Sequence, residues 1–343
     1  MTGELVGRLL DPRPLSAREV RATFACLIAE RSSDAERAAV LVALAARPRR
    51  TSELVAFARE MRRRAVPFPI PARETAVDLC GSGGADRPSF NVSTVGALVV
   101  RAAGVPVVKH GNRSRGICGS SDLLEALGLP VTTSIAFARE SHRRLGIAFL
   151  HAPLFHPATR AVAAVRRTLG IPTIFNRLGP LTNPARVSCQ VSGATNVGHA
   201  TEAAGALRAL GVVRGLSMTS DDGCDEFSPR APTTVVAWDT RGLHRSRLRP
   251  DTLLHHDDRR GDWGPLPPHR AADEAERILA GGGGARRGSV LLTGGAALWV
   301  AGRARSLAAG VGRARDALDS GEAERVLADL RALAERYPAP EAS

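Results

Sequence analysis

The chain has 343 residues, 44% hydrophobic and 24% charged, a composition that excludes a disordered protein and supplies enough apolar surface for two domains. Its 47 Lys and Arg against 34 Asp and Glu give a net charge of +13, but the arginines are spread along the whole chain and only three Trp and one Tyr are available to stack on bases. A nucleic-acid partner is therefore not expected, and the sequence contains no apolar run of about 18 residues that would predict a membrane span.

The first seventy residues are predicted to be helical. Three segments, 16–30, 33–46 and 51–65, carry apolar residues at helical spacing. Each segment begins with a hydroxyl residue, Ser16, Ser33 or Thr51, that is predicted to cap its helix. A proline-rich stretch then separates these helices from the remainder of the chain.

Beyond residue 71 the pattern changes to short apolar runs that are bounded by glycine and separated by segments of helix length. Seven runs are predicted to be strands: 76–80, 105–110, 146–152, 187–194, 215–220, 233–238 and 289–295. This alternation favours an α/β fold with a mostly parallel central sheet, in which ligands bind at the carboxyl ends of the strands. The glycine run 281–284 precedes the last predicted strand and is interpreted as a linker.

The cysteines bear on the compartment of the protein. Cys26, Cys80, Cys118, Cys189 and Cys224 are far apart and odd in number, so neither a disulfide framework nor a zinc site is expected. The beginning of the sequence lacks the basic head and apolar core of a secretion signal. Both observations favour a cytoplasmic protein. The stretch 255–269 contains His and Asp but lies among prolines without a helical register, and we do not expect it to bind a metal.

A first candidate site comes directly after the first strand of the α/β part. Gly81, Gly83 and Gly84 would allow the backbone to approach a ligand closely, and the helix expected after them would offer free N–H groups and its dipole to an anion. Ser93 and Thr94 add hydroxyl donors. A tight turn with an ordinary helix cap is the alternative, since the segment is not a Walker loop and only partly matches a dinucleotide fingerprint.

Lys109 is the only lysine in the chain, and all the other side chains counted among the 47 are arginine. It is expected at the end of the next strand, beside the first. An ammonium is a compact charge on a flexible stem, which suits a multidentate phosphate, whereas a guanidinium offers a planar fork. We therefore predict that Lys109 binds a phosphorylated ligand; survival of one lysine by chance is the alternative.

An acidic segment lies after a third strand end, which we expect to be a neighbour of the other two. It contains Asp221, Asp222, Asp225 and Glu226. Carboxylates this close together repel one another unless water or a hard cation separates them, and Mg²⁺ typically binds one or two carboxylates together with substrate phosphates. An acidic surface turn is the alternative, but the two phosphate-binding features nearby favour a metal site.

Taken together, these motifs resemble one family. The segments "GSGG…SFNVST", "KHGNR", "GSSDLLEALG", "HPATRAVAAVRRTLGIPTIFNRLGPLTNPA", "DDGCDE" and "GGAALWVAG" occur in the order and approximate spacing found in anthranilate phosphoribosyltransferases. The resemblance extends from the N-terminal helices to near residue 335. "KHGNR" and "GPLTNP" also distinguish the chain from the pyrimidine nucleoside phosphorylases, which share the two-domain plan.

The resemblance implies an activity and an architecture. The activity is transfer of the phosphoribosyl group from 5-phosphoribosyl diphosphate to the amino group of anthranilate, a step of tryptophan biosynthesis, with diphosphate leaving and Mg²⁺ assisting. The architecture is a helical domain, residues 1–70, completed by a returning segment near 157–185, and an α/β domain formed by residues 71–156 and 186–343. The resemblance also implies a homodimer.

The same resemblance implies roles for individual residues. Lys109 and Arg166 would be catalytic, Arg166 facing the acceptor carboxylate, while Ser93, Asp225 and Glu226 would hold Mg²⁺. His110 and Asn112 would line the anthranilate path. The full substrate-binding set is Gly81, Ser82, Gly83, Gly84, Asp86, Ser89, Asn91, Val92, Ser93, Thr94, Lys109, His110, Gly111, Asn112, Arg115, Cys118 and Arg166.

Two departures from the family pattern affect the phosphoribosyl diphosphate side. Ala85 stands where the family usually has an aspartate, with Asp86 one residue later, and residues 115–118 replace a serine-rich loop. If Asp86 and Arg115 compensate, the chain is a working anthranilate enzyme, which is the function that we predict. The alternatives are a paralogue acting on another aromatic acid and a non-catalytic descendant that binds nucleotides or nucleic acid. The joint presence of Lys109 and the acidic residues argues against the latter.

Overall fold

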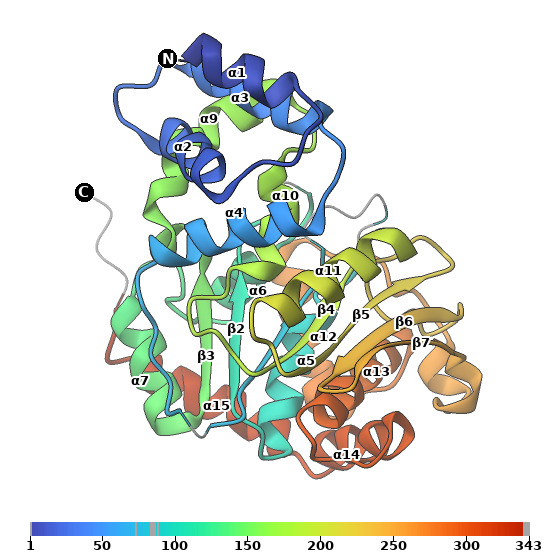
Figure 1. Ribbon diagram of the computed structural model, residues 1–343. Coiled ribbons are helices and arrows are strands. Elements are labelled where there is room, and N and C mark those ends of the chain that lie inside the picture. Colours follow the sequence, from blue (N-terminus) through green and yellow to red (C-terminus); the bar gives the residue numbers. More distant parts are fainter. Residues whose placement is uncertain (1, 73, 83–86, 88, 115, 339–343) are drawn as a thin grey trace.

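Figure 1 shows a computed structural model in which a helical part packs on a larger α/β part. The structure describes residues 2–72, 74–82, 87, 89–114 and 116–338. The helical part contains α1 (Thr2–Leu10), α2 (Ala17–Ile28), α3 (Asp34–Ala46), α4 (Thr51–Arg63), α9 (Arg160–Leu169) and α10 (Ile174–Leu178). Val162 and Phe175 from the last two of these helices share one hydrophobic cluster with Phe24 and Leu41 of the first four. Segments far apart in the sequence therefore lie side by side.

The starts of α2 and α3 are those predicted from their caps. Ser16 and Ser33 each accept a hydrogen bond from the N–H three residues later, where a glutamate completes a capping box. The predicted cap at Thr51 is wrong, because Thr51 is already the first residue of α4 and Arg50 occupies the cap position without a side-chain hydrogen bond. α1 precedes all three of the predicted helices.

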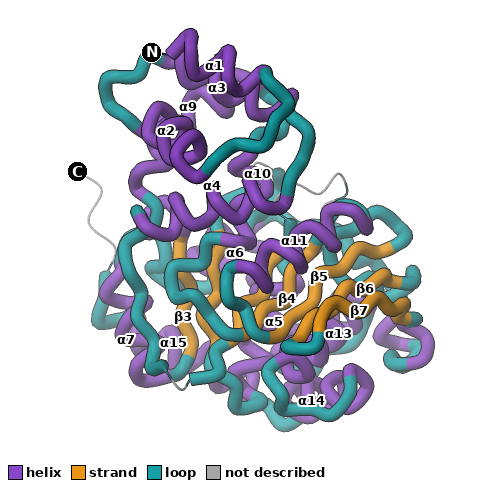
Figure 2. Tube along the Cα trace, viewed as in Figure 1, coloured by secondary structure: helices purple, strands orange, loops and turns teal. Residues whose placement is uncertain are grey.

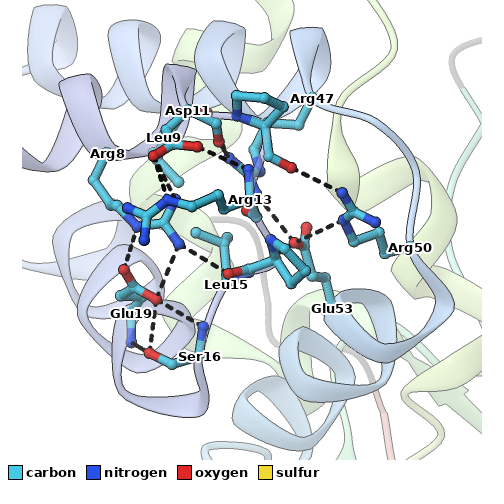
Figure 3. Close-up of polar contacts among 12 residues, drawn as sticks. Arg8, Leu9, Asp11, Arg13, Leu15, Ser16, Glu19, Arg47, Arg50 and Glu53 are labelled. Atoms are coloured by element: carbon cyan, nitrogen blue, oxygen red, sulfur yellow. Dashed lines mark hydrogen bonds and ion pairs between the residues drawn. The ribbon is translucent and has the colours of Figure 1, made fainter.

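A buried arginine fixes the loop between α1 and α2 against the start of α4, as Figure 3 shows. The Arg47 guanidinium donates to the backbone carbonyls of Leu9 at 2.7 Å, of Asp11, and of Arg13 at 2.5 Å. It also lies 3.1 Å from the Glu53 carboxylate, with both side chains buried. This pair and its hydrogen bonds therefore hold the loop between α1 and α2 against the beginning of α4.

The α/β part contains one sheet, drawn in orange in Figure 2. It has seven strands in the order β3-β2-β1-β4-β5-β6-β7. The strands are β1 (Val77–Cys80), β2 (Val107–Gly111), β3 (Ile147–His151), β4 (Cys189–Gly193), β5 (Arg214–Ser220), β6 (Thr233–Asp239) and β7 (Gly242–Leu248). Pairing is parallel from β3 to β5 and antiparallel for β6 and β7. Six of these strands were predicted. β7 was not, because residues 243–247 are all exposed and show no apolar alternation.

Alternating strand residues enter different hydrophobic clusters, which places helices on both faces of the sheet. Val107 of β2 packs in the cluster formed with α5 (Val92–Ala102), α13 (Ala285–Val300) and α14 (Leu307–Asp319). The next residue, Val108, belongs to a separate cluster on the opposite face. On that second face, nearer β6, Val236 and Trp238 pack with α11 (Val197–Ala209) and with α4. The helical part therefore rests on the face that α11 covers.

The predicted strand 289–295 is wrong, because these residues lie inside α13. This helix is buried along almost its whole length, so its sequence lacks the polar face that would reveal a helical period. Gly295 and Gly310 allow α13 and α14 to approach backbone to backbone: a Cβ on Gly310 would lie 2.2 Å from the carbonyl oxygen of Gly295. The glycine run 281–284 consequently joins two helices.

The other helices complete the layers. They are α6 (Ser120–Ala126), α7 (Ile135–Leu145), α8 (Ala152–Phe155), α12 (Pro268–Leu279) and α15 (Glu322–Ala334), with short 3-10 turns η1 (Pro157–Thr159), η2 (Gly179–Leu181), η3 (Pro250–Thr252) and η4 (Asp257–Arg259). In the stretch 255–269, Asp258 is buried and pairs with Arg287 at 2.7 Å and Arg315 at 2.8 Å, which ties η4 to α13 and α14. Within the part of the chain described, no helix has the length and apolar character needed to span a membrane.

Candidate active site

Predicted site residues lie at the carboxyl ends of β1, β2 and β5. β1 and β2 are neighbours as expected, but β4 lies between β1 and β5, so the prediction of three adjacent strand ends is wrong. The loop after β5 nevertheless reaches across the end of β4. Ser82, after β1, donates hydrogen bonds from its N–H and its hydroxyl to Oδ2 of Asp225, each at 2.6 Å. This contact brings the glycine-rich segment and the acidic segment together.

Two glycines make room for Asp225. A Cβ on Gly81 would lie 3.0 Å from Oδ2 of Asp225, and a Cβ on Gly193, at the end of β4, would lie 1.8 Å from its carbonyl oxygen. Gly193 was not among the predicted residues. The only signal for it in the sequence was a glycine at the end of an apolar strand, which often marks a close backbone approach.

Replacing Gly193 by Ala should displace the acidic loop. The added methyl overlaps a backbone atom that has no rotamer with which to move away, so we expect a loss of roughly 2–3 kcal/mol in the free energy of unfolding, together with weaker Mg²⁺ binding. Denaturant unfolding and metal titration measure the two effects. Gly205→Ala is the matched control, since its Cβ would meet only Thr51 Cγ2 at 3.7 Å in the middle of α11. Equal stability of the two variants would contradict the close approach.

The acidic pair is buried and carries a balance of charge that suits a cation. Asp225 and Glu226 are 7% and 5% exposed. Burial and the neighbouring Asp225 charge raise the pKa of Glu226 from 4.5 to about 8, while Lys109 and Ser93 act in the opposite direction. Oε2 of Glu226 is buried and has no hydrogen-bond partner among the described residues. Two carboxylates, one with an unsatisfied oxygen, fit Mg²⁺ together with phosphate oxygens.

The other two acidic residues of this segment point elsewhere. Asp221 forms an ion pair with Arg247 of β7. Oδ2 of Asp222 accepts a hydrogen bond from the Ser228 hydroxyl at 2.8 Å. The four carboxylates of the sequence motif therefore separate into a buried pair and two residues that hold the loop.

Lys109 lies inside β2, not beyond its end, and is 3% exposed. Its ammonium donates to the carbonyl oxygen of Leu79 at 2.5 Å and to the Ser93 hydroxyl at 3.3 Å. Ser93 lies in the first turn of α5, where the Val92 N–H donates to the Phe90 carbonyl at 2.7 Å and the Thr94 N–H to the Asn91 carbonyl at 3.0 Å, so the dipole of the helix is what this end offers to an anion. The structure thus places the single ammonium, a hydroxyl and a helix N-terminus within reach of one anion.

Asp78 is a buried carboxylate in the middle of β1 that was absent from the predicted site. It accepts hydrogen bonds from the His110 N–H at 3.2 Å and from the Asn183 amide at 2.9 Å. The same amide nitrogen donates to the Val108 carbonyl at 2.8 Å, while Oδ1 of Asn183 accepts from the Ala185 N–H. Asn183, in the "GPLTNP" segment, is therefore tied to both β1 and β2. A charged residue within an apolar strand was the sequence signal for Asp78.

Asp78→Asn should weaken this connection. The other hydrogen bonds of Asn183 fix the orientation of its amide. An asparagine at position 78 would therefore turn its NH2 group toward either the Asn183 amide or the His110 N–H, both of which are donors. We expect this to cost about 1–3 kcal/mol in the free energy of unfolding. Burial raises the pKa of Asp78 to about 6, so the carboxylate costs the wild type stability as pH rises through that value. The loss in the variant should therefore be larger at pH 5 than at pH 8.

Denaturant unfolding at the two pH values measures this difference. Ser217→Ala is the control, because the Ser217 hydroxyl is buried without a partner in the described part of the chain and its removal should cost little. A pH-independent loss in Asp78→Asn would refute the buried ionisable role.

His110 is a neutral imidazole in this structure. Burial and the neighbouring His156, whose ring lies 5.1 Å away, lower the pKa of His110 well below 6.5. Nδ1 of His110 lies 3.3 Å from the carbonyl oxygen of Gly179 and must donate the proton of that bond. Nε2 is then an acceptor, and it has no partner among the described residues. It can accept a hydrogen bond from a ligand N–H.

Arg166 approaches the same region from α9. Its guanidinium lies over the Phe175 ring, 5.2 Å from the centroid, and donates to Oδ1 of Asn176 at 3.4 Å. Both partners belong to α10, which continues directly into η2 and the Gly179 carbonyl that holds His110. One short segment therefore positions Arg166 and His110.

The remaining predicted residues surround α5 and the loop after β2. Asn91 donates to the carbonyl oxygen of Cys118 at 3.2 Å, which connects the start of α5 to that loop. Asn112 exchanges backbone hydrogen bonds with the Ser120 hydroxyl, and a Cβ on Gly111 would collide with that hydroxyl at 2.2 Å. Val92 and Thr94 are buried in the first turn of α5, with Ser89 before it. The predictions for Gly83, Gly84, Asp86 and Arg115 lie outside the described residues.

The chain is similar to known proteins over almost its whole length. Residues 73–324 match the a/b domain of the glycosyl transferase family, and residues 3–65 match its helical bundle domain. The chain is 38% identical to the anthranilate phosphoribosyltransferase of Desulfosudis oleivorans over 332 residues, 96% of this chain and 98% of that protein. It is 40% identical to that of Solibacter usitatus over 334 residues, 96% of each chain.

Solved structures show the same fold. The crystal structure of anthranilate phosphoribosyltransferase from Thermus thermophilus is 37% identical, with a TM-score of 0.88 over 96% of this chain and 99% of that one. The Saccharomyces cerevisiae enzyme in complex with PRPP and Mg has a TM-score of 0.83 over 98% of each chain; at 23% identity this likeness concerns the fold alone. The chain therefore belongs to the anthranilate phosphoribosyltransferase family.

Proposed function

We propose that this protein transfers the phosphoribosyl group of 5-phosphoribosyl diphosphate to the amino group of anthranilate and releases diphosphate. The observation that carries the proposal is the buried Asp225–Glu226 pair beside the Lys109 ammonium and the start of α5. Buried carboxylates next to a buried ammonium suit a ligand that contains both a metal ion, for the carboxylates, and phosphates, for the ammonium. Family membership supplies the acceptor, since the relatives are named for anthranilate.

The residues around the acidic pair would hold the leaving group. Asp225, Glu226 and the Ser93 hydroxyl would bind Mg²⁺, which when bound neutralises charge that develops on the departing diphosphate. Lys109 and the positive end of the α5 dipole would stabilise the same phosphates, since both are fixed in a buried place. The protein backbone at Gly81 and Ser82 would lie along the donor. The hydrogen bond between Asn91 and Cys118 would hold the neighbouring loop beside it.

The acceptor would enter from the α9 and α10 side. Arg166 offers a guanidinium fork for the anthranilate carboxylate, and the free acceptor nitrogen of His110 suits the amine. An aromatic amine is already unprotonated near neutral pH, so it can attack C1 of the ribose without first losing a proton to a base. Positioning two substrates and excluding water then supply most of the catalysis.

Fluorescence tests the proposal directly, since anthranilate loses its emission when it is phosphoribosylated. Emission should fall only when the protein, Mg²⁺ and 5-phosphoribosyl diphosphate are all present. Binding of the donor without loss of anthranilate would contradict the acceptor, and a screen of other aromatic acids at fixed donor and metal would then identify the true one. Salt-sensitive DNA binding without donor binding would contradict the enzyme itself.

The helical part also supports the proposal of a homodimer in the cytoplasm. Leu10 of α1 is 64% exposed and Val42 of α3 is 44% exposed. These helices pack against each other, and each carries one of the two exposed apolar side chains. A second copy would cover them, which sedimentation or light scattering can test. The five cysteines are all free thiols, as suits a reducing compartment.

A further inference from the structure

The turn formed by residues 262–264 connects two segments of the candidate active site. The carbonyl oxygen of Trp263 accepts a hydrogen bond from the Phe90 N–H at 3.2 Å. The indole is buried and belongs to a small hydrophobic cluster with Cys224. Phe90 directly precedes the cap residue of α5, and Cys224 directly precedes Asp225 of the acidic pair. Trp263 therefore links the phosphate side of the site to the metal side.

Arg286, in the first turn of α13, holds this turn in place. It forms an ion pair with Asp262 at 2.5 Å, and its Nε and one terminal nitrogen donate to the Gly264 carbonyl at 3.3 and 3.2 Å. The same guanidinium lies over the Phe90 ring, 5.9 Å from the centroid. A guanidinium that stacks on a ring and bonds to a turn has few orientations open to it. Arg286 thus fixes Phe90 against the turn that accepts its N–H.

The second turn of α13 holds the far side of the acidic pair. Ser289 is fully buried, and its hydroxyl donates to the Phe227 carbonyl at 2.6 Å. Phe227 directly follows Glu226 and is itself buried in the large hydrophobic cluster of the α/β part. α13 and the turn that it carries therefore contact both the chain before α5 and the chain on either side of the carboxylates. These contacts come from residues that have no part in the binding of donor, metal or acceptor described above.

We propose that Trp263 and Arg286 are positioning residues for the transfer of the phosphoribosyl group. They hold the start of α5 at a fixed separation from Asp225 and Glu226, so that Mg²⁺ and the diphosphate of the donor bind together. Ser93 at one end of this span and the carboxylates at the other would share the metal ion. A change in their separation weakens joint binding more than it weakens the binding of either ligand alone. The inference rests on the proposed function, because it concerns the donor and the metal ion of that reaction.

Two variants test this role. Arg286→Gln removes the ion pair and the stacked guanidinium, and Trp263→Phe keeps a ring but leaves a gap beside Cys224. Calorimetric titration with 5-phosphoribosyl diphosphate at several Mg²⁺ concentrations measures the factor by which the metal tightens donor binding. This factor should fall by about five- to tenfold in each variant, while the affinity for Mg²⁺ alone stays within about twofold of wild type. Complexation of Mg²⁺ by the donor in solution is the same in every titration and cancels from the comparison.

Steady-state kinetics give a second readout that separates positioning from folding. The KM for the donor should rise by about tenfold in both variants, and the KM for anthranilate should stay within about twofold, because the residues assigned to the acceptor are not altered. A merely structural role would lower the denaturation midpoint while leaving the coupling factor and this difference between the two KM values at wild type.

The chain offers a matched control for each variant. Arg277 pairs with Glu274, which Arg286 also approaches at 3.8 Å, and donates to the Gly283 carbonyl at 2.9 Å. Among the described residues it makes no hydrogen bond to the turn 262–264, so Arg277→Gln should keep the wild-type coupling factor. Trp299→Phe makes the same aromatic exchange near the other end of α13 and should also keep it.

An unchanged coupling factor in Arg286→Gln or in Trp263→Phe would overturn the role of that residue. An equal loss of coupling in the two controls would overturn the positioning role altogether. If the donor binds and both variants lose the coupling, but anthranilate does not react, the acceptor of the proposed function is wrong and the positioning role is supported. Failure of this inference and failure of the proposed function are therefore distinguishable.

Discussion

Glu226→Gln should lower kcat/KM by about 10²–10³-fold at a Mg²⁺ concentration that saturates the wild-type protein. The variant loses one charge of the pair that would hold the cation and stabilise the leaving diphosphate. The shape of the side chain is kept, and the carboxylate is buried beside Asp225. Turnover as a function of Mg²⁺ concentration measures the effect. A higher Mg²⁺ requirement should accompany the loss of rate.

The pH dependence separates metal binding from folding in this variant. The pKa of Glu226 is raised to about 8, so its carboxyl contributes stability below 4.5 that is lost as pH rises through about 8. Glutamine cannot ionise, and the metal-free variant should therefore resist denaturant better than the wild type above pH 8 while being the poorer enzyme. In the wild type, Mg²⁺ binding should tighten as pH rises toward 8, because a proton competes with the metal.

Asp221→Asn is the control for the loss of charge. Asp221 belongs to the same loop but pairs at the surface with Arg247 of β7, so turnover should stay within about twofold. If Asp221→Asn lost as much activity as Glu226→Gln, the distinction between the buried pair and the rest of the loop would be wrong.

Lys109→Arg should impair use of the phosphoribosyl diphosphate more than it impairs folding. The ammonium fits a narrow place, 2.5 Å from the Leu79 carbonyl and 3.3 Å from the Ser93 hydroxyl, at 3% exposure. A longer, planar guanidinium cannot make both contacts, and we expect kcat/KM for the donor to fall by about 10–100-fold, with a loss of roughly 1–3 kcal/mol in stability. Steady-state kinetics against donor concentration and denaturant unfolding measure the two changes.

The matched control is Arg139→Lys, at a side chain that donates to the Pro67 carbonyl at the surface. This variant exchanges the two cation types in the reverse direction at an exposed position, where the packing does not restrict the side chain. Its rate and stability should therefore remain at wild-type values. Wild-type donor kinetics in Lys109→Arg would show that the single lysine of the chain is incidental.

Much of the fold was predictable because local pattern and tertiary environment agree. Ser16 and Ser33 cap their helices as their sequences indicate, and six strands were found from apolar runs. The errors arose where burial removed or reversed the pattern. α13 is apolar on nearly every side and has the composition of a strand, while β7 is exposed on both faces and has the composition of a loop.

The candidate site was predictable only where residue type reveals chemistry. Lys109 and the acidic pair stand out in sequence, because a lone ammonium and adjacent carboxylates have few structural uses. The sequence does not single out Asp78, Asn183 or Gly193, because their role depends on contacts with residues from other strands and loops. Pairings of that kind depend on strand order, and the placement of β4 between β1 and β5 was not predicted.

That strand order has a consequence for how the enzyme can vary. Ser82 and Asp225 meet above β4, so β1 and β5, which carry them, are held two interstrand spacings of roughly 4.8 Å apart while the loops at their ends are in contact. The backbone hydrogen bonds between the strands do not depend on side-chain identity, and they fix the distance between β1 and β5 below the catalytic centre. A substitution in the loop after β1 or after β5 would therefore leave the distance between these two strands unchanged.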